Sequence, residues 1–261
     1  TAKPSPSAPS VNGTVTLTDG ADGDGLAVSA NGSGSILIDA NTAGSAILVN
    51  ANVVSGTGHV TLKAADGIDV AAGVAILTST AGTISVDAEG GALTMSGTSV
   101  MTATGSSLRL HASKDITVGN LTAADVSLVS DTGAIVNAVG STKNVTSTNL
   151  RMNSDDAIGA ANRHMTTAVT NVTAQSAGTT TSGMYVTEDD AVTVTGVAVT
   201  VTDFNADGTT TVVTDGSQSD LTSGLNGNVV LVTLNGTVTL TDGADGDGLA
   251  VSANGSGSIL I

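Results

Sequence analysis

The sequence predicts an all-β fold in which short parallel strands stack in regular coils. Three observations lead to this prediction: a strand-favouring composition, a strand motif that recurs at fixed spacing, and turn-forming residues between the strands. The 261-residue chain contains 33 glycines, one Tyr, one Phe, and no Trp or Cys. Because large aromatic side chains are nearly absent, any core must consist of Val, Ile, Leu and Ala, which suits thin, regular layers. The abundant Val and Thr residues favour strands.

The fixed spacing is clearest in four segments that align without gaps. They are GSILIDA (34–40), GHVTLKA (58–64), GTISVDA (82–88) and SSLRLHA (106–112), and each begins 24 residues after the one before. Alternating apolar and polar residues mark each segment as a strand with one buried face. The alternate positions would face outward: Leu37, Thr61, Ser85 and Arg109. The buried positions would form two columns: Ile36, Val60, Ile84, Leu108, and Ile38, Leu62, Val86, Leu110.

Shorter strands are predicted between these segments. Gly, Asn, Asp or Ser stands at nearly every junction and supplies the turns. Three short strands per 24 residues describe one coil of a parallel β-solenoid, in which each strand pairs with its equivalent one coil on. An antiparallel sandwich also has short alternating strands, but it does not require a gapless 24-residue recurrence. The shorter strands are GIDVA (67–71), VAILT (74–78), GALTM (91–95), SVMTA (99–103) and DITVG (115–119).

A longer repeat contains this short one. The stretch NGTVTLTDGADGDGLAVSANGSGSILI occupies residues 12–38 and recurs unchanged at 235–261, 223 positions later. Residues 12–234 are therefore interpreted as one tandem repeat, and 235–261 as the start of the next, so that the sequence stops within a repeat. The Pro- and Ser-rich residues 1–11 are interpreted as a linker or a processed N-terminus.

The spacing is less regular in the second half of the repeat. Residues 12–140 are predicted to form a regular solenoid, and residues 141–234 an irregular continuation of it. Within the irregular part, SDDAIGAANRHM (154–165) is the stretch that could form a short helical turn or a protruding loop.

The charge balance limits the partners. The formal net charge is −16, from 23 Asp and Glu residues against seven Lys and Arg. This argues against nucleic acid, whose affinity depends on Lys and Arg neutralising phosphates, and against anionic lipid surfaces. No apolar run approaches the roughly 20 residues of a membrane span, so we expect no membrane insertion. An acidic surface favours divalent cations.

Three long strings carry a resemblance to a known group of proteins. GSILIDANTAGSAILVNA, GHVTLKAADGIDVAAGVAILTSTAGTISVDA and SLRLHASKDITVGNLTAADVSLVSDTGAIVNA resemble the haemagglutinin-type repeats of giant bacterial surface and secreted proteins, such as filamentous haemagglutinins. The similarity lies in composition and strand–turn rhythm over about residues 13–140. It implies a right-handed parallel β-helix, export to the cell surface, and a role in adhesion, filaments or matrix. It brings no catalytic residues.

Two acidic stretches suit Ca²⁺, which prefers clustered oxygen ligands on flexible loops. In TDGADGDG (18–25, and again 241–248), Asp19, Asp22 and Asp24 lie within six residues. The alternative interpretation is that these Asp-Gly pairs only form turns.

The second stretch, DFNADG (203–208), matches the first half of an EF-hand loop. Asp203, Asn205 and Asp207 would be the ligands, but Thr214 takes the twelfth position in place of Glu. Asp215 and Asp220 lie nearby and could complete a different oxygen cage. Ca²⁺ is the one cofactor that the sequence suggests.

Other polar groups receive plainer interpretations. The acidic run Glu188, Asp189 and Asp190 could act on glycosides, but a charged strand corner on the surface is the simpler interpretation. The three histidines have no metal-ligand spacing. Because His111 occupies the polar slot of its motif, we expect it to be exposed. Glycosylation sequons begin at Asn12, Asn31, Asn120, Asn144, Asn171, Asn235 and Asn254.

Together these features predict a structural, non-enzymatic extracellular protein that forms a bacterial surface filament, sheath or adhesive stalk. Its partners would be itself or the next tandem repeat, through end-to-end and lateral contacts, and surface glycans. One alternative is an adhesin that binds a glycan or a host protein through residues 140–230. A more remote one is a solenoid polysaccharide-degrading enzyme, for which the aromatic platforms that bind sugar rings are lacking.

Overall fold

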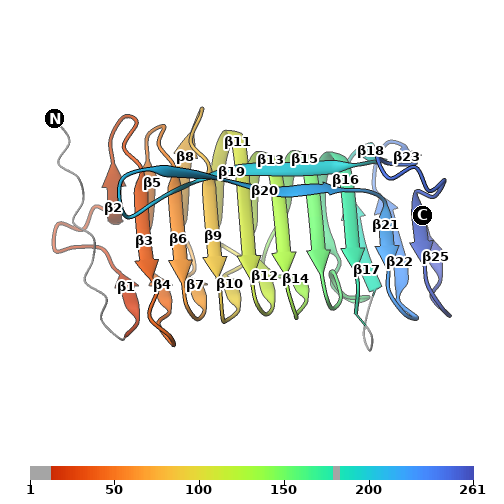
Figure 1. Cartoon of the computed structure of the whole chain (residues 1–261), viewed down its shortest axis with the longest axis horizontal. Helices are drawn as coiled ribbons and strands as arrows, with labels where there is room; N and C mark the ends of the chain where they lie inside the picture. Colours follow the sequence, from red (N-terminus) through yellow and green to blue (C-terminus); the bar gives the residue numbers. More distant parts are fainter. Residues whose placement is uncertain (1–12, 179–182) are drawn as a thin grey trace.

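The computed structural model describes residues 13–178 and 183–261. Within these ranges the chain forms 25 strands and no helix, and the stacked strands lie side by side along one long axis, with the first and the last strand at opposite ends (Figure 1). The expectation of an all-β fold with parallel strand pairing is therefore confirmed. Nowhere in these ranges is there a helix long and apolar enough to cross a membrane. The predicted linker, residues 1–11, lies outside the described residues.

The first half of the chain forms three parallel ladders, and each turn of chain contributes one strand to each ladder. The first ladder contains, in order, β1 (Val15–Leu17), β4 (Ile47–Val49), β7 (Ile68–Val70), β10 (Leu93–Met95), β12 (Ile116–Val118) and β14 (Ile135–Asn137). The second begins with β2 (Leu26–Ala30), β5 (Asn52–Ser55) and β8 (Ala75–Ser79). The third begins with β3 (Ile36–Ala40), β6 (Val60–Ala64) and β9 (Ile84–Ala88).

Long strands then serve the second and third ladders at once. The first of them bends at Gly105, whose left-handed backbone (φ 72°) few other residues adopt without strain. Each pairing leads to the next strand along the stack, and no sheet closes on itself. The long strands are β11 (Val100–Ala112), β13 (Asn120–Ser130), β15 (Val145–Ser154) and β16 (Met165–Ser176).

Parallel pairing continues to the C-terminal end, although the turns become uneven. Residues 155–164 form a loop in which Ala160 and Arg163 exchange backbone hydrogen bonds, and not a helical turn. The remaining stacked strands are β17 (Gly183–Glu188), β18 (Val192–Val194), β21 (Leu221–Ser223), β22 (Asn228–Thr233), β23 (Val238–Leu240), β24 (Val251–Ala253) and β25 (Ile259–Leu260).

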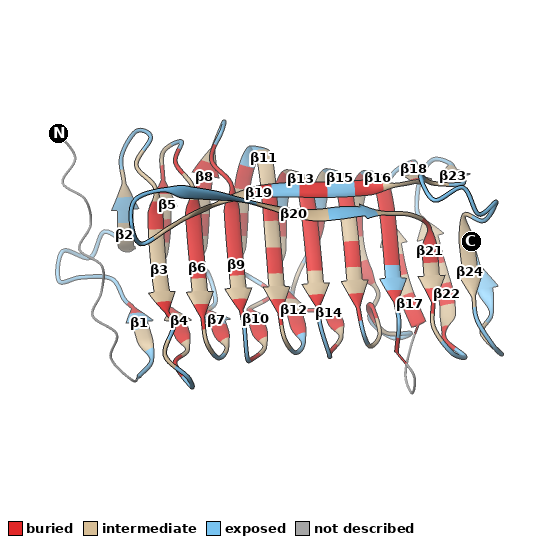
Figure 2. Cartoon of the chain, in the orientation of Figure 1, coloured by how far each residue is buried: buried red, intermediate tan, exposed pale blue. Residues whose placement is uncertain are grey.

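The core consists of the predicted aliphatic columns. In the third ladder Ile36 lies opposite Val60, Val60 opposite Ile84, and Ile84 opposite Leu108. Seven of the eight predicted residues are buried, and Ile38 is half-buried. Figure 2 shows buried residues along the middle of the stack and more exposed ones in the last strands. Matching positions therefore stack directly, as in-register parallel pairing requires.

Steric contact between turns explains the glycine that begins the 24-residue motif at Gly58 and Gly82. A Cβ atom on Gly58 would lie 2.1 Å from the carbonyl oxygen of Gly34, and one on Gly82 would lie 2.2 Å from that of Gly58. Successive turns of backbone touch at Gly58 and Gly82, and only glycine leaves enough space at these two positions.

An antiparallel hairpin that was not predicted, formed by β19 (Val197–Phe204) and β20 (Thr210–Gln218), lies outside the stack, and we call it the strap. The strap runs along the long axis and crosses the strands of the third ladder (Figure 1). Thr61 and Ser85, which we expected to face outward, are 0% and 2% exposed because the strap covers them. Residues 197–218 thus do not continue the parallel stack, as had been predicted, but cover strands of the third ladder.

Hydrogen bonds and one ion pair fix the strap to the turns of chain that contain β6, β9, β11 and β15. The Phe204 amide donates to Thr61 Oγ1 (2.9 Å), and the Thr202 amide donates to Thr83 Oγ1 (3.0 Å). Arg109 Nε donates to both carboxylate oxygens of Asp215, at 3.1 and 3.0 Å. Nearer the C-terminus, Arg151 Nε donates to the Gly216 carbonyl (3.1 Å) and Gln218 Nε2 to the Met152 carbonyl (2.8 Å).

The glycine corner can be tested by substitution. Gly58→Ala should lower the melting temperature strongly, with a loss of about 2–4 kcal/mol of stability, because the new methyl group must push two turns of backbone apart. Gly216→Ala is the control, since nothing lies within 4 Å of a Cβ at that position. Equal melting temperatures for the two variants, measured by circular dichroism, would contradict the close stacking.

Candidate functional site

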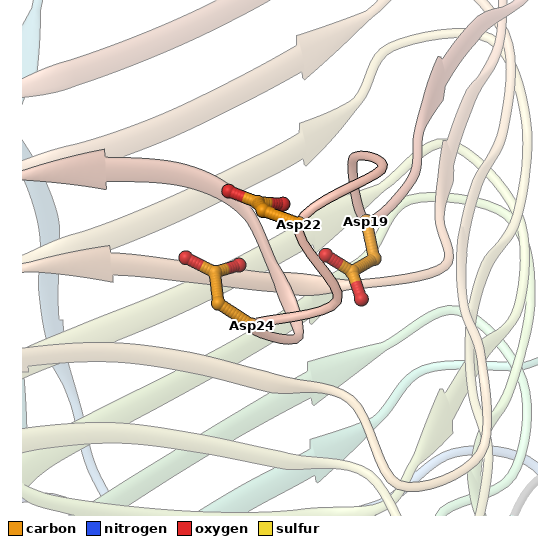
Figure 3. A group of neighbouring side chains, drawn as sticks. All are labelled: Asp19, Asp22 and Asp24. Atoms are coloured by element: carbon orange, nitrogen blue, oxygen red, sulfur yellow. The ribbon is translucent and has the colours of Figure 1, made fainter.

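The first acidic loop brings together the three aspartates that the sequence analysis selected. Asp19, Asp22 and Asp24 lie on the loop between β1 and β2, and one carboxylate oxygen of each lies within 4.8 Å of the others (Figure 3). All three side chains are exposed, and Asp24 Oδ1 accepts a hydrogen bond from the Leu26 amide at 2.8 Å. The oxygens could surround a cation, and calcium binding here stays a prediction.

The second copy of this loop has the same sequence but different neighbours. Asp242 Oδ2 accepts a hydrogen bond from the Gly248 amide (3.1 Å). Asp245 and Asp247 instead cluster with Asp220, which lies in the turn before β21. The pairing of β24 with β21 places these two turns side by side. Asp220 was expected near the EF-hand-like stretch, and no local signal in the sequence connects it with Asp245 and Asp247, 25 and 27 positions further along the chain.

The residues of the EF-hand-like stretch are dispersed. Asn205 and Asp207 lie at the tip of the strap, where Asn205 donates to Thr209 Oγ1 and Asp207 accepts from the same residue. These hydrogen bonds from Thr209 lower the pKa of Asp207. Asp215 lies further along β20 and is paired with Arg109. Throughout the described residues, three acidic or histidine side chains with ligand atoms this close occur only in the two loop clusters.

A column of alternating charge runs along the outside of the third ladder. Asp39, Lys63, Asp87 and His111 occupy equivalent positions on successive strands. Opposite charges on neighbouring strands stabilise the pairing, whereas like charges would destabilise it. The polar position of the 24-residue motif therefore alternates in charge from one strand to the next.

His111 is held tightly within this column. Its Nδ1 lies 2.8 Å from Asp87 Oδ1, and its Nε2 lies 3.1 Å from Asp131. Its side chain is only 19% exposed, so the prediction that His111 is an exposed residue is wrong. The hydrogen bond to Asp87 raises the pKa of His111. Burial acts to raise the pKa of Asp87, but the hydrogen bond and charge of His111 outweigh it, and that pKa is lowered.

Glu188 is buried, not exposed at a surface corner as expected. It is 1% exposed, Thr167 Oγ1 donates to its Oε2 (2.6 Å), and the Val169 amide donates to its Oε1 (2.9 Å). Burial raises the pKa of this carboxyl group. The neighbouring Asp189 forms an ion pair with Lys143. Because hydrogen-bond donors of β16 occupy both carboxylate oxygens of Glu188, this group joins the end of β17 to β16.

The sequons lie in different environments. Asn144 is fully buried: its Nδ2 donates to the Val118 carbonyl (2.7 Å) and its Oδ1 accepts from the Thr166 amide (2.9 Å). A glycan cannot be attached at this position in the folded chain. Asn31, Asn235 and Asn254 are exposed, and Asn12 lies outside the described residues.

Comparison with known proteins gives no further guide. No protein-family model matches the chain, and neither does any curated protein or solved structure. The function must therefore be inferred from the sequence and the geometry.

The His111 pairing predicts a pH dependence of stability. A raised pKa in the folded state contributes stability that is complete below the unfolded pKa of about 6.5 and is lost as pH rises through the folded pKa. The melting temperature of the wild type, relative to His111→Gln, should therefore fall as pH rises above about 6.5.

His59 provides a control of opposite sign. Burial lowers the pKa of His59, so its protonation destabilises the fold. The melting temperature of the wild type, relative to that of His59→Gln, should therefore rise as pH rises. Thermal unfolding between about pH 5 and 9 measures both differences. Parallel curves for wild type and His111→Gln would contradict the pairing.

Proposed function

We propose that this chain is a segment of a structural extracellular protein, a tandem-repeat β-solenoid that extends into a surface filament, sheath or adhesive stalk. The observation that carries the proposal is that the two identical 27-residue segments, 12–38 and 235–261, pair with the rest of the chain on opposite sides. The resemblance to haemagglutinin-type repeats supports a right-handed coil and a location at the bacterial cell surface.

The pairing partners of the two segments are complementary. In the first copy, β1, β2 and β3 pair with the strands that follow them, β4, β5 and β6. In the second copy, the equivalent strands β23, β24 and β25 pair with strands that precede them, β18, β21 and β22. One sequence therefore fits a neighbour on either side. A coil between two repeats would use both sides at once.

Burial supports the same conclusion. Leu17 is 9% exposed in the first copy, whereas its equivalent Leu240 is 48% exposed. Likewise Ile36 is 5% exposed and its equivalent Ile259 is 50% exposed. The apolar residues exposed at the edge of the last strands are thus the same residues that the next turn of chain covers in the first copy. Unpaired edges of this kind favour the addition of further strands.

The strand pairings also support an estimate of the length that one repeat would add. Eight successive pairings join β3 to β24 along the third ladder. At roughly 4.8 Å for each pairing, one repeat would lengthen the rod by on the order of 40 Å. The ladder that begins with β3 divides at β16. Val172 leads through β18 to β23, the equivalent of β1, and Ala174 leads through β21 to β24, the equivalent of β2.

An adhesin remains the second candidate, and the strap favours it. The strap lies within residues 140–230, and its outer strand exposes threonines and Val212, which is 67% exposed. Such a surface could bind a glycan or a host protein. Val212→Lys should abolish binding on a glycan array or to host cells and leave the rod shape unchanged. Unchanged attachment would exclude this face as the binding surface.

The scaffold proposal can be tested by extending the chain. When residues 39–234 are added after Ile261, negative-stain microscopy should show one straight rod longer by on the order of 40 Å. Hydrogen exchange at residues 235–261 should become slower, because the next turn covers the exposed edge.

Two variants of the extended chain serve as comparisons. Ile259→Lys should divide the rod into two, because a charge would enter the aliphatic column, whereas Val139→Lys, on a loop residue that is 80% exposed, should not. Two separate particles in the unsubstituted extended chain would refute the proposal.

A further inference from the structure

The turn before β21 and the second acidic loop meet beside the β21–β24 pairing. One carboxylate oxygen of each of Asp220, Asp245 and Asp247 lies within 4.8 Å of the others. They share the wall of an open cavity of about 430 Å³ with Gln218 and Arg151. This volume leaves room for a hydrated ion.

Asp220 differs from every aspartate of the first loop because it is buried. It is 3% exposed, and its Oδ1 has no hydrogen-bond partner. Gln218 Oε1, in the same cavity, is also buried and without a partner. A buried acceptor without a donor destabilises the fold by about 1–3 kcal/mol, and by more when it is charged. Two such oxygens beside two further carboxylates therefore point to a ligand that accepts oxygen lone pairs.

The electrostatics point the same way. Asp220, Asp245 and Asp247 bring three carboxylates together, and like charges this close repel one another. Arg151 lines the same cavity and its Nη1 is buried without a hydrogen-bond partner. Its Nε donates to the Gly216 carbonyl, and the acid that offsets its burial is Asp215, so it forms no ion pair with the three carboxylates. The three carboxylates thus lack a cationic partner within the described part of the chain.

We propose that Asp220, Asp245 and Asp247 bind a divalent cation, Ca²⁺, with Gln218 Oε1 as a further oxygen ligand and water completing the shell. Ca²⁺ accepts six to eight oxygen ligands in flexible geometry, which suits two loops and an open cavity. Such a site corresponds to the affinities of extracellular calcium modules, on the order of 10⁻⁴ to 10⁻³ M.

The site joins the end of one repeat to the beginning of the next. Asp220 belongs to the first repeat, and Asp245 and Asp247 belong to the second. Binding by this chain does not depend on the proposed function, but recurrence of the site at every junction of an array rests on it. At each junction the ion would bind the strap's exit turn to the incoming coil.

The test is a calcium titration of the chelator-treated chain. CaCl₂ should bind at the Asp220 site by isothermal titration calorimetry and raise the melting temperature of the wild type. Asp220→Asn and Asp245→Asn should each weaken the binding at least tenfold. Asp22→Asn, the equivalent of Asp245→Asn in the first loop, should change it little. MgCl₂ should bind more weakly, since Mg²⁺ demands stricter geometry.

A second measurement separates ion binding from a merely structural role. Without calcium, Asp220→Asn should unfold at a higher temperature than the wild type, because the substitution removes an uncompensated buried charge. A lower melting temperature would indicate that Asp220 only supports its turn and would overturn the proposal. So would a wild type that does not respond to calcium, or binding that Asp22→Asn abolishes and Asp220→Asn does not.

The outcomes for the ion site and for the scaffold are distinguishable. The titration uses the single chain, whereas the scaffold test uses the extended chain and microscopy. Continuous rods without calcium binding would reject only the site. Calcium binding by a chain whose extended form gives two separate particles would reject only the scaffold.

Discussion

Backbone hydrogen bonding from each turn of chain to the next is the interaction on which the rest of this structure depends. A turn of about 24 residues has no second layer of its own, so its strands and its apolar side chains are satisfied only by the turns before and after it. In-register pairing then aligns equivalent residues, such as Ile36, Val60 and Ile84, in one column. The same constraint excludes a side chain where backbones touch, as at Gly58.

The polar groups follow the same geometry. Because equivalent positions lie directly above one another, a repeated charge would meet its own kind on both sides. The column formed by Asp39, Lys63, Asp87 and His111 avoids this by alternating sign. Asparagine side chains at equivalent positions bond to one another instead. Asn171 Nδ2 donates to Asn149 Oδ1 at 2.8 Å, and Asn149 Nδ2 donates to Asp125 Oδ1 at 2.6 Å. Such columns join successive turns through side chains as well as backbone.

Identical sequence in two settings shows how much the burial of a strand depends on its neighbours. The two identical 27-residue segments form strands in both places, but only the first copy is covered by a following turn of chain. The acidic loop changes its partners too: Asp19 completes the cluster in the first copy, whereas Asp220 does so in the second. A loop that is an exposed acidic turn in one place becomes one side of a candidate ion site in the other.

The sequence by itself determined the local pattern: short strands, their buried columns and the glycine turns. Each 24-residue segment contains the information for these features. The alternation of apolar and polar residues determines which face of a strand is buried, and the recurrence of the motif determines which residues stack on one another. Tertiary structure alone decided the strap, since Val197–Gln218 reads as strand–turn–strand whether it pairs along the stack or folds across it. It also decided the Asp220 cluster, because ladder pairing, and not sequence proximity, brings the turn before β21 to the loop before β24. Contacts between turns depend on register and on the length of every intervening loop, and neither can be read from a single segment.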